Sequence, residues 1–277
     1  MTICVLDRVV WHDLHVTEPG GPRPALRTLT IADPPDLWRA LGFTVAGDGH
    51  LRLGDVTVRL GGPGRGITGW HVAHAPGLCD ALRLSDAPGL SDAPGLSDAP
   101  APPAISAAPT ATASAAAHAN GAEGIDHVVV LTPDFDATAA AMEAIGLPFR
   151  RVRRASATVR QGFRRLGPAI LEVVEAHQGE RPRLWGLVVI VPDLEALATV
   201  AAPHVKSPRP AVQPGRRIAL VGESAGLGTR LAFMDPEPSR DPGPGPDPEP
   251  GPDPDPEPGH DPEPGRGAGA PPAADRS

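Results

Sequence analysis

The sequence predicts an α+β protein built from repeated βαβββ modules. One observation is a strand-to-helix junction that occurs three times, each time as Pro-Asp followed by a large apolar residue. Another is that a short run rich in β-branched residues precedes each junction, and a short helical pattern follows it. The junctions are Pro35-Asp36-Leu37, Pro133-Asp134-Phe135 and Pro192-Asp193-Leu194. A unit that recurs in this way indicates internal duplication.

Each repeat begins with a strand, at 29–31, 128–131 and 187–191, which is short and apolar enough to be buried on both faces. Proline then ends the strand. The aspartate after it is expected to cap the helix, because its carboxylate can accept from the first-turn N–H groups and suits the positive end of the helix dipole. Gly42 and Gly146 follow the first two helices at the C′ position, where glycine adopts a positive φ without cost.

Three further strands are predicted after each helix, which completes the βαβββ pattern. In the first repeat they lie at 44–46, 50–53 and 56–60, and in the second at 149–153, 159–166 and 170–174. The third repeat is less distinct, with its last two strands at 217–221 and 230–234. A strand at 67–73 is interpreted as the remnant of a fourth module, which a linker otherwise replaces.

Low-complexity sequence divides the chain. Residues 84–99 repeat Leu-Ser-Asp-Ala-Pro-Gly and lead into an Ala/Pro/Ser/Thr stretch, which is typical of a flexible linker. From residue 237 onward there are 14 prolines in 41 residues and no large apolar side chain, so this tail should be disordered. We therefore predict a degenerate N-terminal βαβββ module at 1–80, a linker at 81–121, a paired-module domain at 122–236 and a disordered acidic tail at 237–277.

Charge and targeting signals bound the class of protein. The tail holds 10 acidic and 3 basic residues, so it carries −7 of the net charge of −8 and the other 236 residues sum to −1. A nearly neutral folded part without interleaved aromatic and basic residues argues against nucleic-acid binding. There is no signal-peptide pattern and no apolar run near the roughly 20 residues that span a bilayer. We expect a cytoplasmic protein with no membrane partner, and the use of arginine in place of lysine suggests a bacterial source.

Four segments resemble strands of the vicinal oxygen chelate superfamily, the glyoxalase and bleomycin-resistance-like dioxygenase group. Gly124 to Asp134 and Ala169 to Glu175 resemble the first and last strands of one module, and 185–193 and 231–236 resemble the same strands of its partner. In that superfamily, two βαβββ modules pair so that their curved sheets enclose a cleft. The resemblance implies a curved mixed sheet with a cleft over 122–236, a small-molecule ligand in the cleft, and a homodimer as the assembly to consider.

The resemblance also implies a divalent metal, held by one ligand on the first strand and one on the last strand of each module. These positions map to His127 and Glu172 in the first module of the pair, but to Gly186 and Ala232 in the second. This chain is thus a ligand-depleted member of the group. An imidazole and a carboxylate are a suitable half-site for Zn, Mn, Ni or Fe. Glu175 or Glu223 could replace a missing ligand.

Glu172 is the residue that we predict to be catalytic. It lies in an otherwise apolar strand, where an ionised carboxylate needs a cation, an arginine or water. Arginines cluster on the predicted middle hairpin of the same module, and we expect Arg151, Arg153 and Arg160 to bind an anionic ligand through bidentate contacts. The alternative is a solvated hairpin whose charges protect an edge strand.

Three functions stay open at this point. Because the second pair of ligands is absent, the leading one is binding of a small molecule in the cleft without a complete metal site. The alternatives are a metal-dependent lyase, isomerase or dioxygenase acting on vicinal oxygens, and a non-catalytic scaffold that binds proteins. The sequence Gly222-Glu223-Ser224-Ala225-Gly226 matches a hydrolase nucleophile elbow, but Gly226 and Gly228 weaken the helix that should follow, and the only later histidine is His260 in the predicted tail. We interpret it as a loop between the last two strands.

Overall fold

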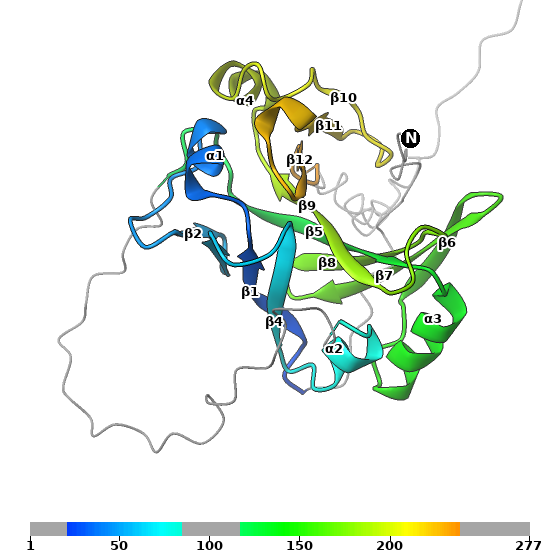
Figure 1. Cartoon of the computed structure of the whole chain (residues 1–277). Helices are drawn as coiled ribbons and strands as arrows, with labels where there is room; N and C mark the ends of the chain where they lie inside the picture. The colour runs from blue at the N-terminus through cyan, green and yellow to red at the C-terminus, as the bar shows by residue number, and fades with distance from the viewer. Residues whose placement is uncertain (1–20, 85–116, 239–277) are drawn as a thin grey trace, which may run out of the picture. The chain divides into compact units, whose positions relative to one another are not determined.

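The computed structural model describes residues 21–84 and 117–238, which all belong to one compact unit. They form a four-stranded sheet and an eight-stranded sheet, with the helices connecting the strands (Figure 1). Predictions about residues 1–20 of the N-terminal module, about 85–116 and about the tail from 239 lie outside the described residues. In the described part, no helix is long and apolar enough to span a bilayer.

The eight-stranded sheet consists of two βαβββ modules and has the order β10-β11-β12-β9-β5-β8-β7-β6. The first module comprises β5 (Gly124–Thr132), α3 (Phe135–Ala144), β6 (Arg151–Ser156), β7 (Val159–Leu166) and β8 (Ala169–Glu175). The second comprises β9 (Arg183–Ile190), α4 (Leu194–Val200), β10 (Arg209–Pro210), β11 (Arg217–Leu220) and β12 (Arg230–Met234). In each module the first and last strands are parallel neighbours, and β5 and β9 join the modules as an antiparallel pair. The predicted paired-module architecture is confirmed.

Strand alternation gives the eight-stranded sheet two different faces. One face, which we call the helix face, carries Val128, Val130, Leu171 and Val173, which belong to the main hydrophobic core. The opposite face carries His127 and Glu172 and is called the His127 face. Its apolar residues form two smaller clusters around that pair. The clusters are Val129, Leu131 and Val174 on one side, and Val188, Ile218, Ala232 and Met234 on the other.

The four-stranded sheet has the order β2-β3-β1-β4. Its elements are β1 (Ala25–Ile31), α1 (Pro35–Ala40), β2 (His50–Leu53), β3 (Val56–Leu60), β4 (Ile67–Ala73) and α2 (Leu78–Ala81). The strand predicted at 44–46 is wrong, because that segment turns toward β2, and this module is reduced to βαββ. The remnant strand at 67–73 is confirmed. It pairs antiparallel with β1, as β9 pairs with β5, and the short helix α2 that follows it was not predicted.

The three Pro-Asp junctions differ at the helix N-terminus. Asp134 accepts a hydrogen bond from the Ala137 N–H, and Asp193 accepts from the first turn of α4, so both cap their helices as predicted. The prediction is wrong for Asp36, because an extra proline shifts the N-cap of α1 to Pro34, and Asp36 instead forms an ion pair with Arg39. Burial of the first strand on both faces is also wrong for β1, where polar residues alternate with buried ones.

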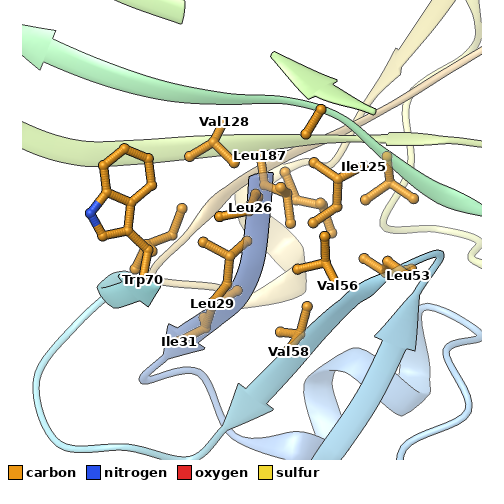
Figure 2. Close-up of a cluster of buried hydrophobic side chains, with 14 of the residues drawn as sticks. Leu26, Leu29, Ile31, Leu53, Val56, Val58, Trp70, Ile125, Val128 and Leu187 are labelled. Atoms are coloured by element: carbon orange, nitrogen blue, oxygen red, sulfur yellow. The ribbon is translucent and has the colours of Figure 1, made fainter. Parts of the chain in front are cut away.

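The small sheet packs against the helix face of the large one. Figure 2 shows Leu26, Leu29 and Val56 of the small sheet directed toward Val128 and Leu187 of the large sheet. These side chains belong to one continuous hydrophobic core, which is the main source of stability because the gain scales with buried apolar area.

Polar contacts also link the two sheets. The buried Asp33 carboxylate, just before α1, accepts hydrogen bonds from the backbone N–H groups of Gly228 (2.6 Å) and Thr229 (3.3 Å). Within the predicted linker, His118 accepts from the Thr44 N–H at 3.0 Å, and the Asn120 side chain donates to the Leu41 carbonyl at 2.9 Å. Residues 117–121 therefore hold the small sheet in place.

Candidate functional site

The structure brings His127 and Glu172 together. His127 lies on β5 and Glu172 on the parallel neighbour β8, and Nε2 of the imidazole is 3.3 Å from Oε2 of the carboxylate. Both side chains are about 2% exposed. The approach has the distance of an ion pair, but it does not have hydrogen-bond geometry, so His127 Nε2 is a buried nitrogen without a hydrogen-bond partner among the described residues.

The other imidazole nitrogen is fixed by a neighbour on the same strand. His127 Nδ1 is 2.8 Å from Oδ2 of Asp126. Alternation would place Asp126 on the opposite face, but a β-bulge between Ile125 and His127 inserts it as an extra residue against β9. Arg216 completes this side of the site, donating from Nη2 to Oδ1 of Asp126 at 2.5 Å and from Nε to the Asp235 carbonyl at 2.7 Å.

The second oxygen of Glu172 is fixed in a similar way from the hairpin. Gln161 on β7 donates from Nε2 to Glu172 Oε1 at 2.8 Å. The side-chain oxygen of Gln161, Oε1, accepts from Arg153 Nε at 2.5 Å. A continuous polar network therefore runs across the His127 face. In order, its members are Arg216, Asp126, His127, Glu172, Gln161 and Arg153.

Burial and charge act in opposite directions on the three ionisable groups at the centre. Burial raises the pKa of Glu172, and the nearby positive groups offset this only in part. Burial alone would lower the pKa of His127, but the hydrogen bond to Asp126 and the charge of Glu172 outweigh it, so the pKa is raised. For Asp126, burial opposes ionisation, yet the contacts with His127 and Arg216 prevail and its pKa is lowered. Asp126 thus favours the ionised form, and His127 and Glu172 compete for a proton.

The second module offers no matching ligands. Ala232 pairs with Val188 of β9 as Glu172 pairs with Val129 of β5, so the register confirms that alanine stands where the second carboxylate would be. Glu175 lies on the helix face in an ion pair with Arg160, and Glu223 is exposed near Arg230. Neither reaches the His127 and Glu172 pair. Within 21–84 and 117–238, no group of three or more His, Cys, Asp or Glu residues could hold a metal.

His127 and Glu172 nevertheless fit two ligand positions of a divalent metal. Bonds of about 2.0–2.2 Å around a tetrahedral ion place two ligand atoms about 3.3–3.6 Å apart, and the observed separation of Nε2 and Oε2 is 3.3 Å. The ligating nitrogen has no hydrogen-bond partner among the described residues, and the opposite nitrogen faces a carboxylate, which is the usual support of a metal-bound histidine. The remaining ligand positions would have to be filled by substrate or water.

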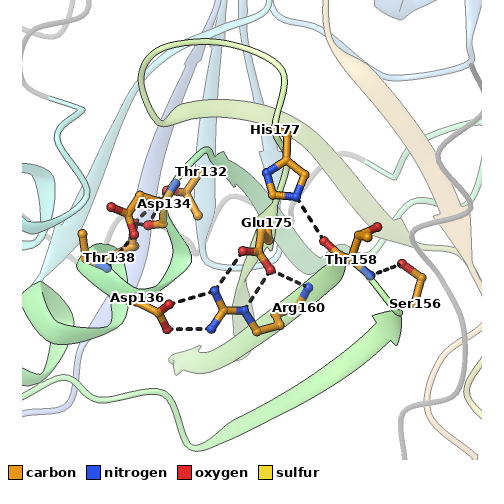
Figure 3. Close-up of polar contacts among 10 residues, drawn as sticks. Thr132, Asp134, Asp136, Thr138, Ser156, Thr158, Arg160, Glu175 and His177 are labelled. Carbon is orange, nitrogen blue, oxygen red and sulfur yellow. Dashed lines mark hydrogen bonds and ion pairs between the residues drawn. The ribbon is translucent and has the colours of Figure 1, made fainter.

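The three predicted ligand-binding arginines have different surroundings. Arg151 and Arg153 alternate with exposed residues on β6 and lie opposite Phe163 and Gln161, on the His127 face. Arg160 instead lies on the helix face. Figure 3 shows its guanidinium between Glu175 and Asp136, with contacts of 2.8 Å and 2.6 Å, and it also stacks on the Phe135 ring. The structure does not bring Arg160 to the other site residues.

Sequence reasoning missed Asp126, Arg216 and Gln161. Asp126 is adjacent to His127, and only the bulge, which has no sequence signature, turns it toward the imidazole. Gln161 could have been found from strand alternation once the pairing of β7 with β8 was known. A pocket with a cavity volume of about 260 Å³ lies elsewhere, between the two sheets, and includes Leu26, Leu53, Ile125 and Ala169 in its lining.

The Gly222 to Gly226 motif is a loop with one 3-10 turn, Glu223–Ala225, between β11 and β12, as predicted. His204, upstream in the sequence, lies with Nδ1 3.4 Å from the Ser224 hydroxyl. This contact was not predicted, because only histidines after the serine were considered. His204 is half-buried and Ser224 is exposed, and no carboxylate in the described part of the chain forms an ion pair with His204. The pair does not form a nucleophile elbow.

No protein-family model and no curated protein sequence matches this chain. Solved structures with a similar fold include methylmalonyl-CoA epimerase from Mycobacterium tuberculosis, with 16% identity over 43% of this chain and 91% of that chain and a TM-score of 0.36. A hypothetical protein from Bacillus halodurans C-125 has 16% identity over 41% and 94%, with a TM-score of 0.33. A methylmalonyl-CoA epimerase from Streptomyces coelicolor, in complex with 2-nitronate-propionyl-CoA, has 18% identity over 40% and 95%, with a TM-score of 0.33.

The strand order identifies the fold without reference to these similarities. Two βαβββ modules are each closed by a parallel pair of first and last strands, and they are joined by an antiparallel pair of their first strands. This is the arrangement that the sequence resemblance implies for residues 122–236. The paired-module part of the chain therefore has the vicinal oxygen chelate fold.

Proposed function

We propose that the chain binds a small molecule on the His127 face, with His127 and Glu172 as the point of attachment. The observation that carries this proposal is the buried His127 Nε2 without a hydrogen-bond partner, in a network whose other contacts are hydrogen bonds. A buried polar atom left without a partner lowers stability by about 1–3 kcal/mol, so its retention is explained if a ligand supplies the partner. Trp185, Arg153 and Arg165 are half-buried.

The protonation of the pair supports a ligand that carries oxygen atoms. With Nδ1 directed at Asp126, His127 can donate from Nε2 when charged or accept there when neutral. Glu172 is held at one oxygen by Gln161, and its other oxygen faces the imidazole. When His127 and Glu172 hold a proton between them, they can donate it to a ligand oxygen, and when they lack it, they can accept one from an adjacent carbon, as general acid–base chemistry requires.

The second candidate is a metal-dependent lyase, isomerase or dioxygenase, favoured by the 3.3 Å separation that suits two metal ligands. A divalent metal, when bound, would polarise vicinal oxygens of a substrate. His127 and Glu172 would hold it, while Asp126 and Gln161 would orient these two ligands. The partner positions Gly186 and Ala232 supply no further ligand, which is why binding without a complete metal site is the first proposal.

The test is the metal content and thermal stability of untagged protein purified without chelator. His127→Gln and Glu172→Gln are compared with Glu175→Gln, a control carboxylate on the same strand but on the helix face. Each protein is screened with Zn²⁺, Mn²⁺, Ni²⁺ and Fe²⁺, and then with small oxygen-bearing molecules in the presence of chelator.

Three outcomes are informative. Metal near one equivalent, lost in both site variants and kept in the control, would support the enzyme. Ligands that stabilise the metal-free protein and depend on His127 and Glu172 would support binding alone. If neither metals nor small molecules change the melting temperature of the unmodified protein, both proposals are refuted and the scaffold becomes the leading hypothesis.

A further inference from the structure

One arginine on the His127 face differs from its neighbours on the hairpin. Arg160 is bound by Glu175 and Asp136, Arg164 donates to the Pro148 carbonyl, and Arg153 donates to Gln161. Arg165 is half-buried at the end of β7, and its Nε–H is buried without a hydrogen-bond partner among the described residues. Because a guanidinium donates five N–H groups and is charged at every physiological pH, it needs an acceptor.

Strand register places Arg165 in one row with the site. Arg165 pairs with Ile170 of β8, and Ile170 pairs with His127 of β5. Alternation puts all three side chains on the same face, because the neighbouring Leu166 and Leu171 belong to the core on the helix face. The backbones of β7 and β5 are two strand spacings, or about 9.5 Å, apart. The row therefore consists of a cation, a buried aliphatic side chain, and the imidazole of the proposed site.

We propose that Arg165 is the receptor for the carboxylate of a short acid whose other end contacts His127 and Glu172. Nε–H and the adjacent Nη–H form the planar fork that matches a carboxylate. Ile170 supplies an apolar surface for a short aliphatic middle, and the pair at the far end supplies partners for a second oxygen-bearing group. The ligand is therefore a short aliphatic acid with an oxygen function at its other end. This inference depends on the proposed function, because it assumes that the His127 face is the binding site.

The experiment measures binding of succinate to the full chain in the presence of chelator, by calorimetry and thermal shift. Succinamide, of the same length but uncharged, is the matched ligand control. Arg165→Gln is compared with Arg154→Gln, which removes the same charge from an exposed position on the other face of the hairpin. Arg165→Lys keeps the charge but removes the fork, and far-UV circular dichroism of each variant verifies folding.

The expected result is that succinate binds and succinamide does not. Arg165→Gln should weaken succinate binding by about tenfold or more, the loss expected for a charge-assisted pair of hydrogen bonds, and Arg154→Gln should leave it unchanged. The affinity of Arg165→Lys for succinate should lie between those of Arg165→Gln and Arg154→Gln. Equal weakening by Arg165→Gln and Arg154→Gln would show general electrostatic attraction and overturn the inference.

The failure of this inference is distinguishable from failure of the proposed function. If uncharged ligands stabilise the protein through His127 and Glu172 while succinate does not bind, the site stands and the role of Arg165 is refuted. If no tested ligand, charged or neutral, responds to substitution of His127 or Glu172, both are refuted.

Discussion

Two buried carboxylates lie on either side of one imidazole, and the structure gives them opposite properties. Asp126 accepts from Arg216 and faces His127, so it remains ionised although it is buried. Glu172 has an uncharged amide at one oxygen and the imidazole at the other, and its pKa is raised. Removing the charge of Asp126 and removing the charge of Glu172 should therefore change the free energy of unfolding by different amounts, because a different opposite charge is left behind in each case.

Asp126→Asn should destabilise the protein strongly, because Arg216 would remain buried without its carboxylate. Breaking one partner of a buried ion pair typically costs about 3–5 kcal/mol in the free energy of unfolding. Glu172→Gln should cost less, since an uncharged amide replaces a carboxyl group whose pKa is already raised by burial. Urea unfolding of both variants measures the difference. Equal losses would contradict the assigned charge states.

The pKa directions predict how stability depends on pH in metal-free protein. The raised pKa of His127 means that its contribution is present below the unfolded value of 6.5 and is lost as pH rises through the folded value. The lowered pKa of Asp126 means that its contribution is present above 3.8 and is lost as pH falls. From pH 6.5 upward, the melting temperature of the unmodified protein should fall more steeply than that of His127→Gln. Parallel curves would refute the raised pKa of His127.

At the scale of elements, the helix junctions show what sequence patterns can and cannot predict. Pro-Asp after a strand correctly located all three helices, because proline ends the strand and aspartate suits the first turn. The same pattern gave the wrong cap at Asp36, since a second proline precedes it and the N-cap lies two residues earlier, at Pro34. The order of strands and helices in the large sheet was predicted from the repeat, but the bulge at Asp126 was not, because a bulge depends on the partner strand.

The contrast between two aspartates at corresponding junctions is testable. Asp134→Ala removes the 2.9 Å hydrogen bond to the Ala137 N–H and should destabilise the protein by about 1 kcal/mol. Asp36→Ala removes an ion pair with an exposed carboxylate and should have a much smaller effect, as surface ion pairs usually do. Chemical denaturation of the two variants measures this difference. A loss for Asp36→Ala as large as that for Asp134→Ala would contradict the cap assignment.

The candidate site illustrates a further limit of the sequence. His127 and Glu172 were identified from a family resemblance, and the structure confirms that they meet. Gly186 was located by counting back from Pro192, and Ala232 by aligning the last strands of the two modules; the observed pairing of Ala232 with Val188 agrees with that alignment. The orienting residues could not be predicted, because Arg216 is 90 positions from Asp126 and its contact depends on how the two modules pair. Contacts between modules have no local pattern.

At the scale of the whole molecule, the small sheet and the large sheet are joined by a shared core and a few buried polar contacts. Asp33 is central to these contacts, because its carboxylate accepts from Gly228, Thr229 and, at 3.4 Å, from the Trp38 indole. The loop that contains Gly228 and Thr229 leads directly into β12, whose residues Ala232 and Met234 lie on the His127 face. Loss of the Asp33 hydrogen bonds should therefore destabilise the segment of the second module that leads into β12.

Asp33→Ala should lower the free energy of unfolding by about 2–3 kcal/mol, because it leaves buried N–H donors without a charged acceptor. Amide hydrogen exchange should also accelerate at Gly228 and Thr229. Asp55→Ala, at an exposed turn between β2 and β3, is the control and should change neither quantity. Unchanged exchange at Gly228 in Asp33→Ala would show that the core alone holds the sheets together.

The central claim is that the ligand contacts Nε2 of His127. Nitrogen NMR of protein labelled with ¹⁵N-histidine tests it most directly, with the His127 signals assigned by their absence in His127→Gln. In metal-free protein, Nδ1 should be protonated and hydrogen-bonded to Asp126. Addition of Zn²⁺ or of succinate should then shift the Nε2 signal and leave Nδ1 protonated. A response at Nδ1, or no response of His127 to any addition, would contradict the account.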